Sequence, residues 1–273
     1  MKANQLIQKY ASHQLITKKI DMPAGYLDDS HSHPWHQIVF PLTGLLQSNM
    51  GHKRAIVPHN ALLFIPANTV HKSVAVTDTQ FFAIYLNPNA LIHYGDTPKS
   101  CLVTAFLKEL LLLLFDKRTA HQSEASIAHL LAVLNDQIET AEHYEIPLLI
   151  PEDRRLMAIF NQLRQQPDLK FTLKDWAEKV GASERTLSRL CAKEFNLSFS
   201  LWRQNIRLVL SLQLLDTGMA IQEIAVELGY ASDSAYIHAF KGMFDQTPSR
   251  YRHSRLLYSL SADQKLTQSE TNV

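Results

Sequence analysis

The sequence predicts an α+β protein: an N-terminal β-sheet domain, a central pair of helices and an all-α C-terminal domain. Three observations support this prediction. Short apolar runs separated by turn residues fill the first third of the chain, apolar residues then recur at three- and four-residue spacing, and the C-terminal third repeats one helical pattern twice. With 273 residues the chain is long enough for two domains that each bury a core.

Strand-length apolar runs dominate the chain between Ile16 and Leu86. In order, these runs are QIVF, LLQS, RAIV, ALLFI, KSVAV and FFAIYL. Turn residues such as PLTG and PHN separate them. Apolar runs of this length and spacing are typical of a β-sandwich or a small β-barrel.

Helical periodicity begins near residue 99, and two helices are predicted over residues 99–142, with Ser123 at the start of the second. The expected apolar stripes are Leu102, Phe106, Leu110 and Leu113, then Ile127, Leu130, Leu131, Leu134 and Ile138. The residues before Pro147 and Pro151 disfavour helix, so EIPLLIPED is a predicted hinge. From Glu152 to about Arg255 the pattern is helical, and the remaining tail is polar.

Composition excludes several classes of protein. A net charge of +1 creates no global field that attracts nucleic acid. Whether the protein binds DNA must therefore be judged from where its charged residues lie. Cys101 and Cys191 lie far apart, which favours the reducing cytosol over a disulfide-rich secreted protein. The N-terminus lacks the apolar stretch of a signal peptide, and the run from Leu110 to Phe115 is far shorter than the ~20 residues that span a bilayer. We expect a soluble, cytoplasmic protein.

The C-terminal third contains two copies of one pattern, at residues 173–195 and 221–244. Each copy predicts a short helix, a glycine turn and a second helix capped by serine, which is a helix-turn-helix motif. The matched pairs are Leu173 and Ile221, Ala177 and Ala225, Val180 and Leu228, Gly181 and Gly229, Ser183 and Ser232, Leu187 and Tyr236, and Phe195 and Phe244. A helix over about residues 198–218 joins the copies and spans ~30 Å, close to the ~34 Å between successive major grooves of B-DNA.

The candidate DNA-reading residues lie at outward positions of the second helix of each motif. Arg185 and Arg189 share a face of this helix in the first motif, where arginine can pair with guanine or grip phosphate. The alternative is that both arginines are simply solvated surface. The corresponding helix of the second motif offers fewer donors, so it is expected to discriminate less or to read a different base step. The full predicted set is Ser183, Arg185, Thr186, Arg189, Asp233, Ser234, Ala235, His238 and Lys241.

Other basic and aromatic residues of this region have simpler interpretations. Lys241, Arg250 and Arg252 are expected to hold phosphates without reading sequence. The aromatic side chains expected to lie in the core, and not to stack on bases, are Trp176, Trp202, Phe240 and Phe244.

The stretch RLVLSLQLLDTGMAIQEIAVELGYASDSAYIHAFKGMFDQTPSRYR resembles the signature of the AraC/XylS family of bacterial transcription regulators, and the resemblance covers about residues 152–255. The matching residues are Gly229, Tyr230, Ser234, Tyr236, Phe240, Lys241, Pro248, Tyr251 and Arg252. Arg185 and Arg189 keep the positions that touch DNA in relatives. His238 stands where the family commonly has arginine and Asp245 where it usually has glycine, so weaker base reading by the second motif is implied.

Residues 31–37 read HSHPWHQ and raise the question of a ligand site. In a strand, His31, His33, Trp35 and Gln37 would share one face, and His36 would point to the opposite side. We therefore expect the first set to converge inside the barrel, and His36 to lie at the surface or in an interface.

The spacing around these histidines resembles the two motifs of cupin barrels. The first motif is matched by Gly25, His31, His33, Gln37 and Gly44, with glutamine where metal-binding cupins have glutamate. The second is matched by Asn60, Pro66, Asn68 and His71, with asparagine twice replacing glycine. Asparagine tolerates left-handed backbone better than other non-glycine residues. Many AraC-like regulators carry such a barrel as their sensor, so the resemblance implies a cupin-like effector-binding domain.

The resemblance also implies candidate ligands. The metal positions fall on His31, His33, Gln37 and His71, which can hold Zn, Ni, Fe or Cu, although no cofactor is required. Loss of the carboxylate is expected to lower metal affinity and to disfavour redox catalysis. A second interpretation is an organic effector bound by the same residues and stacked on Trp35, and a third is a purely structural cluster.

Three functions are compatible with these patterns. The favoured one is a sequence-specific regulator, without catalytic residues, whose affinity for promoter or operator DNA is controlled by a small molecule or metal in the barrel. The alternative is a metal-dependent cupin isomerase or dioxygenase tethered to DNA, and a third is an architectural binder that only dimerises. A homodimer is expected, with RNA polymerase as a further partner if the protein activates transcription.

The predicted organisation has four segments. These are the cupin-like barrel at 1–98, a helical dimerisation or linker segment at 99–147, an AraC-type DNA-binding domain at 148–256 and a polar tail at 257–273.

Overall fold

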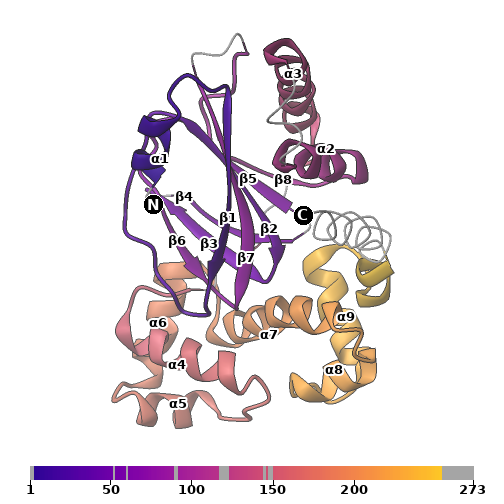
Figure 1. The fold of residues 1–273 in the computed structure, drawn as a ribbon. Coiled ribbons are helices and arrows are strands. Elements are labelled where there is room, and N and C mark those ends of the chain that lie inside the picture. Colours follow the sequence, from indigo (N-terminus) through magenta and orange to yellow (C-terminus); the bar gives the residue numbers. More distant parts are fainter. Residues whose placement is uncertain are drawn as a thin grey trace. The chain divides into compact units, whose positions relative to one another are not determined.

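The computed structural model describes residues 3–51, 53–59, 61–88, 92–116, 123–143, 146 and 150–253. The chain divides into two compact units, Met1–Leu148 and Leu149–Val273. The first unit contains the strands together with three helices, and the second is helical (Figure 1). The predicted α+β class, with a sheet domain followed by an all-α domain, is confirmed. The predicted polar tail and most of the hinge lie outside the described residues.

Two antiparallel sheets form the body of the first unit. The larger has five strands in the order β1 (Leu15–Met22), β7 (Thr79–Leu86), β2 (His36–Thr43), β5 (Ala61–Ile65) and β8 (Lys99–Leu102). The smaller has three strands in the order β4 (Lys53–Pro58), β3 (Leu45–Met50) and β6 (Lys72–Ala75). Every predicted run lies in a strand, whereas β8 falls where the sequence predicted the start of a helix.

The five-stranded sheet is buried on both faces. Val39, Leu63 and Ala83 belong to one cluster, which also contains Leu46 and Val57 of the smaller sheet. The intervening residues of the same three strands, among them Ile38, Phe64 and Phe82, join a second cluster with the helices that follow β8. Burial on both sides explains why runs such as ALLFI and FFAIYL are continuously apolar and do not alternate with polar residues.

Helix α1 (Ala3–Lys9) precedes the strands, and helices α2 (Ala105–Phe115) and α3 (Glu124–Thr140) follow them. Ser123 caps α3 as predicted, because its side chain accepts from the backbone N–H of Ser126. The buried positions of α3 are Leu131, Leu134 and Ile138, with Ile127 and Leu130 packed at their edge. The predicted stripe of the second helix is therefore confirmed.

In the predicted stripe of the first helix, Leu110 is buried as expected, but the other three positions are wrong. Leu102 belongs to β8, where it pairs with Ala61, and Thr104 caps a helix that begins only at residue 105. The buried face consists of Leu107, Leu110, Leu111 and Leu114. Phe106 is 56% exposed and Leu113 is 41% exposed, so these two apolar side chains form the outward face of α2.

The second unit is a succession of helices. They are α4 (Arg154–Gln165), α5 (Leu173–Lys179), α6 (Glu184–Phe195), α7 (Phe199–Asp216), α8 (Ile221–Glu227) and α9 (Asp233–Phe244), with a further helical segment at 248–253. Trp176, Trp202 and Phe240 are fully buried, as predicted, and Phe244 is half-buried. Among the described residues, no helix combines the length and the apolar character needed to cross a membrane.

Candidate functional site

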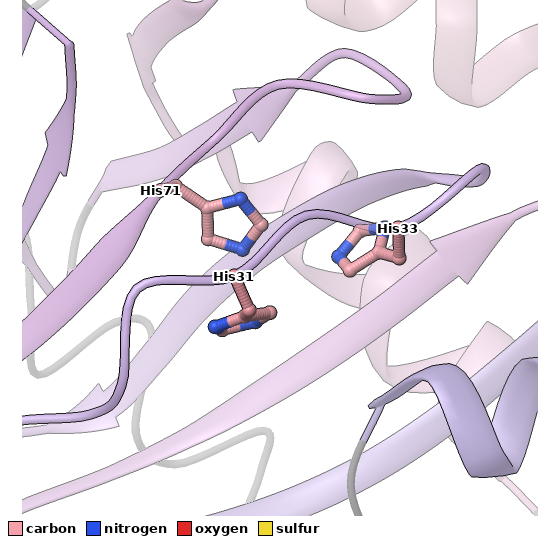
Figure 2. A group of neighbouring side chains, drawn as sticks. All are labelled: His31, His33 and His71. Carbon is pink, nitrogen blue, oxygen red and sulfur yellow. The ribbon is translucent and has the colours of Figure 1, made fainter.

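Three histidines from two segments of the first unit converge (Figure 2). His31 and His33 lie on the chain that enters β2, and His71 lies just before β6. The backbones of His31 and His71 are joined by two hydrogen bonds, of 3.0 and 2.9 Å between nitrogen and oxygen. The expectation of a continuous strand is wrong, because regular pairing begins only at His36, beyond a bend at Pro34. Proline has no N–H to donate to a ladder.

The imidazole rings lie close enough to share one ligand. The ring centroids are 4.4 Å apart for His31 and His71, 5.1 Å for His33 and His71, and 6.0 Å for His31 and His33. One ring nitrogen from each histidine lies within 4.8 Å of the other two. His33 and His71 are buried and His31 is half-exposed, so the cluster has one side open to solvent.

The protonation of each ring is fixed by a backbone carbonyl. Nδ1 lies 2.7 Å from the Asp29 oxygen in His31, 2.7 Å from the Trp35 oxygen in His33 and 2.9 Å from the Thr69 oxygen in His71. Because a carbonyl only accepts, each Nδ1 carries the proton and each Nε2 presents a lone pair. Metal-binding histidines are commonly oriented by this same second hydrogen bond.

Gln37 bridges two of the rings. Its Oε1 atom lies 2.9 Å from Nε2 of His33 and 3.1 Å from Nε2 of His71. Two lone-pair nitrogens and an amide oxygen are all acceptors, so this trio needs a donor or a cation. Either the amide turns its NH₂ towards the imidazoles, or a metal ion binds between them.

Burial keeps the imidazoles of His33 and His71 neutral. It lowers the pKa of His33 below its usual value, despite hydrogen bonds to Gln37 and Trp35 that raise it. Burial lowers the pKa of His71 to about 4. A neutral imidazole is the form that binds a transition metal, so at pH 7 little proton competition opposes binding at these two rings.

The loop that carries His71 is held by the positions that the second motif singled out. Asn68 has φ of 61°, in the left-handed region, as predicted for an asparagine in place of glycine. Its N–H donates to the carbonyl of His33 over 2.8 Å, which ties the loop to the other histidine segment. Gly25 and Gly44 also have positive φ, and a Cβ at Gly44 would lie 2.2 Å from the Asp78 oxygen. Asn60 lies outside the described residues.

Trp35 and His36 occupy opposite sides of the five-stranded sheet. Trp35 is buried in the apolar cluster between the two sheets, together with Val39 and Tyr85. His36 was expected at the surface or in an interface, but it is only 8% exposed and is covered by residues of its own unit, so that expectation is wrong. Its ring stacks on Phe64, with centroids 5.5 Å apart, and its Nδ1 accepts from the N–H of Ala67. The alternation of a strand gave the direction of His36 correctly, but helices α2 and α3 cover that face.

The second unit forms both predicted helix-turn-helix motifs, α5–α6 and α8–α9. Ser183 and Ser232 cap the second helices by accepting from the N–H of Thr186 and of Ala235, each over 3.1 Å. Gly181 has φ of 64° and Gly229 has φ of 72°, so each turn uses the left-handed region. The buried alanines Ala177 and Ala225 lie at the matching positions of α5 and α8.

Most of the predicted reading residues are exposed on these two second helices. Arg185 and Arg189 lie one turn apart on α6. The exposed positions are Ser183, Arg185 and Arg189, then Ser234, Ala235, His238 and Lys241, while Thr186 and Asp233 are half-buried. On α9 the Asp233 carboxylate accepts from the N–H of Ser234 over 2.7 Å, which places a negative charge at the start of the helix. Glu184 occupies the same position at the start of α6, so this charge does not distinguish the two helices.

The predicted phosphate contacts have different environments. Lys241 and Arg250 are exposed. Arg252 is half-buried, and its guanidinium donates to the carbonyl of Met219. One N–H of Arg252 is therefore used by the chain segment between α7 and α8, and a phosphate contact through the others stays a prediction.

Sequence reasoning missed two arginines on α7. Arg203 donates to the carbonyl of Phe171 over 2.6 Å, and Arg207 donates to the carbonyls of Pro167 and Leu169 over 2.6 and 2.9 Å. Burial lowers the pKa of both guanidinium groups below the usual value. Their four-residue spacing, on a helix whose only other charged residue is Asp216, was the signal that could have identified them.

Comparison with known proteins gives one matching family for the sheet-containing part of the chain and another for the helical part. Residues 22–148 match the model of the AraC-like ligand binding domain, and residues 176–254 match a helix-turn-helix domain. The regulatory protein SoxS of Escherichia coli K12 is 35% identical over 78 residues, which are 28% of this chain and 73% of SoxS. The chain belongs to the AraC family of transcriptional regulators.

Other similarities extend over more of the chain. The HTH-type transcriptional regulator NimR of Escherichia coli K12 is 28% identical over 224 residues, which are 81% of each protein. The structure of ToxT from Vibrio cholerae aligns with 89% of this chain and 99% of its own, at 12% identity and a TM-score of 0.39. The chain is thus a DNA-binding transcription regulator with a ligand-binding domain, like the relatives named as regulators.

Proposed function

We propose that this AraC-family regulator responds to a divalent transition metal held by His31, His33 and His71. The observation that carries the proposal is the shared orientation of the three rings: each Nδ1 donates to a backbone carbonyl, which leaves a lone pair on each Nε2. Gln37 adds an amide oxygen within reach of two of these nitrogens. Imidazole ligands suit Zn²⁺, Ni²⁺, Fe²⁺ and Cu²⁺.

A metal at this position would act as a cross-link. His31 and His33 belong to the chain entering β2, whereas His71 closes the loop before β6. Binding to all three rings would therefore hold two segments, otherwise joined by backbone hydrogen bonds, in one arrangement. Such a ligand can control DNA binding if it binds one arrangement of the protein more tightly than another.

An organic effector is the second candidate, and the position of Gln37 favours it. If the amide turns its NH₂ towards the imidazoles, it satisfies His33 and His71 without a cation. The half-exposed His31, with Asp28 3.8 Å from its Nδ1, would then offer a polar wall to an effector with hydrogen-bonding groups. A cupin-type enzyme tethered to DNA is the remaining alternative, and turnover of a bound substrate would reveal it.

We further propose that α6 and α9 contact one DNA duplex at a promoter or operator. The 18 residues of α7 span about 27 Å, comparable with the ~34 Å between successive major grooves. Arg185 and Arg189 would read bases, and α9 would contribute less. A homodimer formed through α2 and α3 would bring four such helices to adjacent sites. RNA polymerase becomes a partner if the regulator activates transcription.

Metal titration of the full chain tests the sensor. We expect the metal-free protein to bind about one Zn²⁺, Ni²⁺, Fe²⁺ or Cu²⁺ per chain, measured by calorimetry and elemental analysis. The double variant His31→Ala/His71→Ala should lose this binding and the metal effect on DNA affinity. The control His13→Ala/His129→Ala removes two exposed imidazoles of the same unit and should bind as wild type. Unchanged binding in the first variant would refute the site.

The same titration separates the alternatives. A protein that binds none of the four metals, but whose melting temperature rises with an organic compound, supports the second candidate. A catalysed reaction of that compound supports the enzyme. No response to metals or compounds would leave a regulator without a ligand switch and would contradict both sensor proposals.

A further inference from the structure

We infer that the loop between α4 and α5, residues 166–172, sets the orientation of the two helix-turn-helix motifs relative to each other. Arg207 and Gly229 are the positioning residues that hold this loop. The inference rests on the proposal that both motifs contact one duplex, because only then does their relative orientation determine which DNA is bound.

The first support is the set of guanidinium contacts from α7. Arg203 and Arg207 lie one turn apart and bind three carbonyls of the loop, those of Pro167, Leu169 and Phe171. Arg207 uses Nε and Nη2 for two different carbonyls, so it fixes the direction of the loop as well as its distance. Because Phe171 packs edge-on against Trp176 of α5, the loop is also continuous with the first motif.

The second support lies on the other motif. A Cβ at Gly229, in the turn between α8 and α9, would lie 2.8 Å from Cα and 2.9 Å from the carbonyl oxygen of Asp168. These are backbone atoms, which cannot rotate away as a side-chain tip can. The loop of the first motif therefore lies directly against the turn of the second, and only glycine leaves room for that contact.

The matching glycine of the first motif shows that this closeness is not a requirement of the turn. Gly181 has φ of 64°, similar to the 72° of Gly229, but a Cβ there would have no described atom within 4 Å. Left-handed backbone explains both glycines. The contact with Asp168 is an additional constraint at Gly229, and it couples the motifs to each other.

These contacts complement α7. Helix α7 itself packs against α6 of the first motif and against α8 and α9 of the second. A loop bound both to the middle of α7 and to the turn of the second motif adds a further point of attachment. We expect it to favour DNA in which the two contacted segments have one fixed spacing.

DNA binding by the full chain tests this inference. A site selected from random DNA is compared with sites in which either half is scrambled, and with one that has a base pair inserted between the halves. Arg207→Lys keeps the charge but not the paired donors, and Gly229→Ala blocks the loop. Both should lower affinity for the intact site by about tenfold or more, keep affinity for single halves, and weaken the penalty of the insertion.

Gly181→Ala is the matched control. It introduces the same left-handed strain without the contact with Asp168, so the ratio of intact-site to half-site affinity should stay as in wild type. Equal losses on every DNA in Arg207→Lys and Gly229→Ala would mean a general folding defect and would overturn the inference. Unchanged affinity for the intact site would overturn it as well.

Distances between the motifs, measured without DNA, separate this inference from the proposed function. Spin labels at Ser188→Cys and Lys241→Cys, both exposed, report the separation of α6 and α9 in labelled chains diluted with unlabelled ones. Cys101 and Cys191 are buried, and burial raises the pKa of their thiols to about 11 and about 12, so they label slowly. Arg207→Lys and Gly229→Ala should broaden the distance distribution, whereas Gly181→Ala should not. An unchanged distribution in the first two would overturn the inference, whatever the DNA result.

Discussion

Arg189 is the residue on which DNA recognition is expected to depend most. It is exposed on α6, one turn after Arg185, in a helix whose start is fixed by the Ser183 cap. The corresponding part of α9 has His238. A guanidinium offers a planar pair of donors that suits guanine, which a histidine cannot match.

Arg189→Ala should therefore weaken binding to the selected site by about 1–3 kcal/mol and relax the preference at one base position. The measurement is a titration of the full chain against the site and its single-base variants. His238→Ala serves as the comparison on the second motif and should cost less. Equal affinity of wild type and Arg189→Ala for the selected site would show that α6 presents another face to DNA.

Residue-level predictions succeeded where the cause was local. Ser183, Ser232, Gly181 and Gly229 were predictable because caps and left-handed turns depend on a few neighbouring residues. Asp245, which replaces the glycine usual in the family, has φ of 54° and so keeps the left-handed conformation of that position.

Other residues depend on partners distant in the sequence. His36 is buried because Phe64 and the helices after β8 cover it, and Arg252 donates a hydrogen bond to the carbonyl of Met219. The local sequence around His36 or around Arg252 does not indicate these partners. For the same reason the contacts of Arg203 and Arg207 could not be derived, although their spacing was visible.

At the level of elements, α2 shows how one misplaced boundary changes a face. The chain from Lys99 to Leu102 completes the five-stranded sheet by pairing with β5, so the helix starts later than periodicity alone indicates. The buried face of α2 consists of Leu107, Leu110, Leu111 and Leu114, and so it lies to one side of the predicted stripe. As a result Phe106 and Leu113, two turns apart, face outward.

The outward face of α2 is where the proposed homodimer is expected to form. Replacing Phe106 and Leu113 with glutamate should place charges in the centre of the proposed dimer and raise its dissociation constant by about thirtyfold or more, since a buried anchor contributes about 2 kcal/mol. Sedimentation of the full chain without DNA measures this change. Val226→Glu, at an apolar position of α8 that is 70% exposed, is the control and should leave the mass unchanged. A dimer that persists in the double variant would exclude this face.

At the level of the whole molecule, a ligand that controls DNA binding must obey a reciprocal relation. If metal changes the DNA dissociation constant by some factor, DNA must change the metal dissociation constant by the same factor, typically 5–150-fold. Two titrations of the full chain, one for metal with and without the selected DNA and the other in reverse, check this. Unequal factors would mean that the metal acts at a second site, or only on aggregated protein.

The division of the chain into a sheet unit and a helical unit followed from its patterns alone. Strand runs, helical spacing and an internal repeat each extend over many residues, so single exceptions such as β8 do not hide them. The histidine site was predicted as a set of residues, but its chemistry was not. Which ring nitrogen carries the proton depends on the carbonyls of Asp29, Trp35 and Thr69, whose positions only the fold determines.

Strand β2 separates the histidine site from the apolar cluster that contains α2 and α3. Gln37 turns to the imidazoles on one side, while its neighbours His36 and Ile38 turn to the side covered by α2 and α3. Two backbone N–H groups of the loop that ends at His71 donate hydrogen bonds to this segment. The N–H of Asn68 donates to the carbonyl of His33, and the N–H of Ala67 donates to Nδ1 of His36. A ligand that shifted this loop would therefore also shift the packing beneath α2 and α3. In the proposed mechanism, the change would cross only the thickness of one strand.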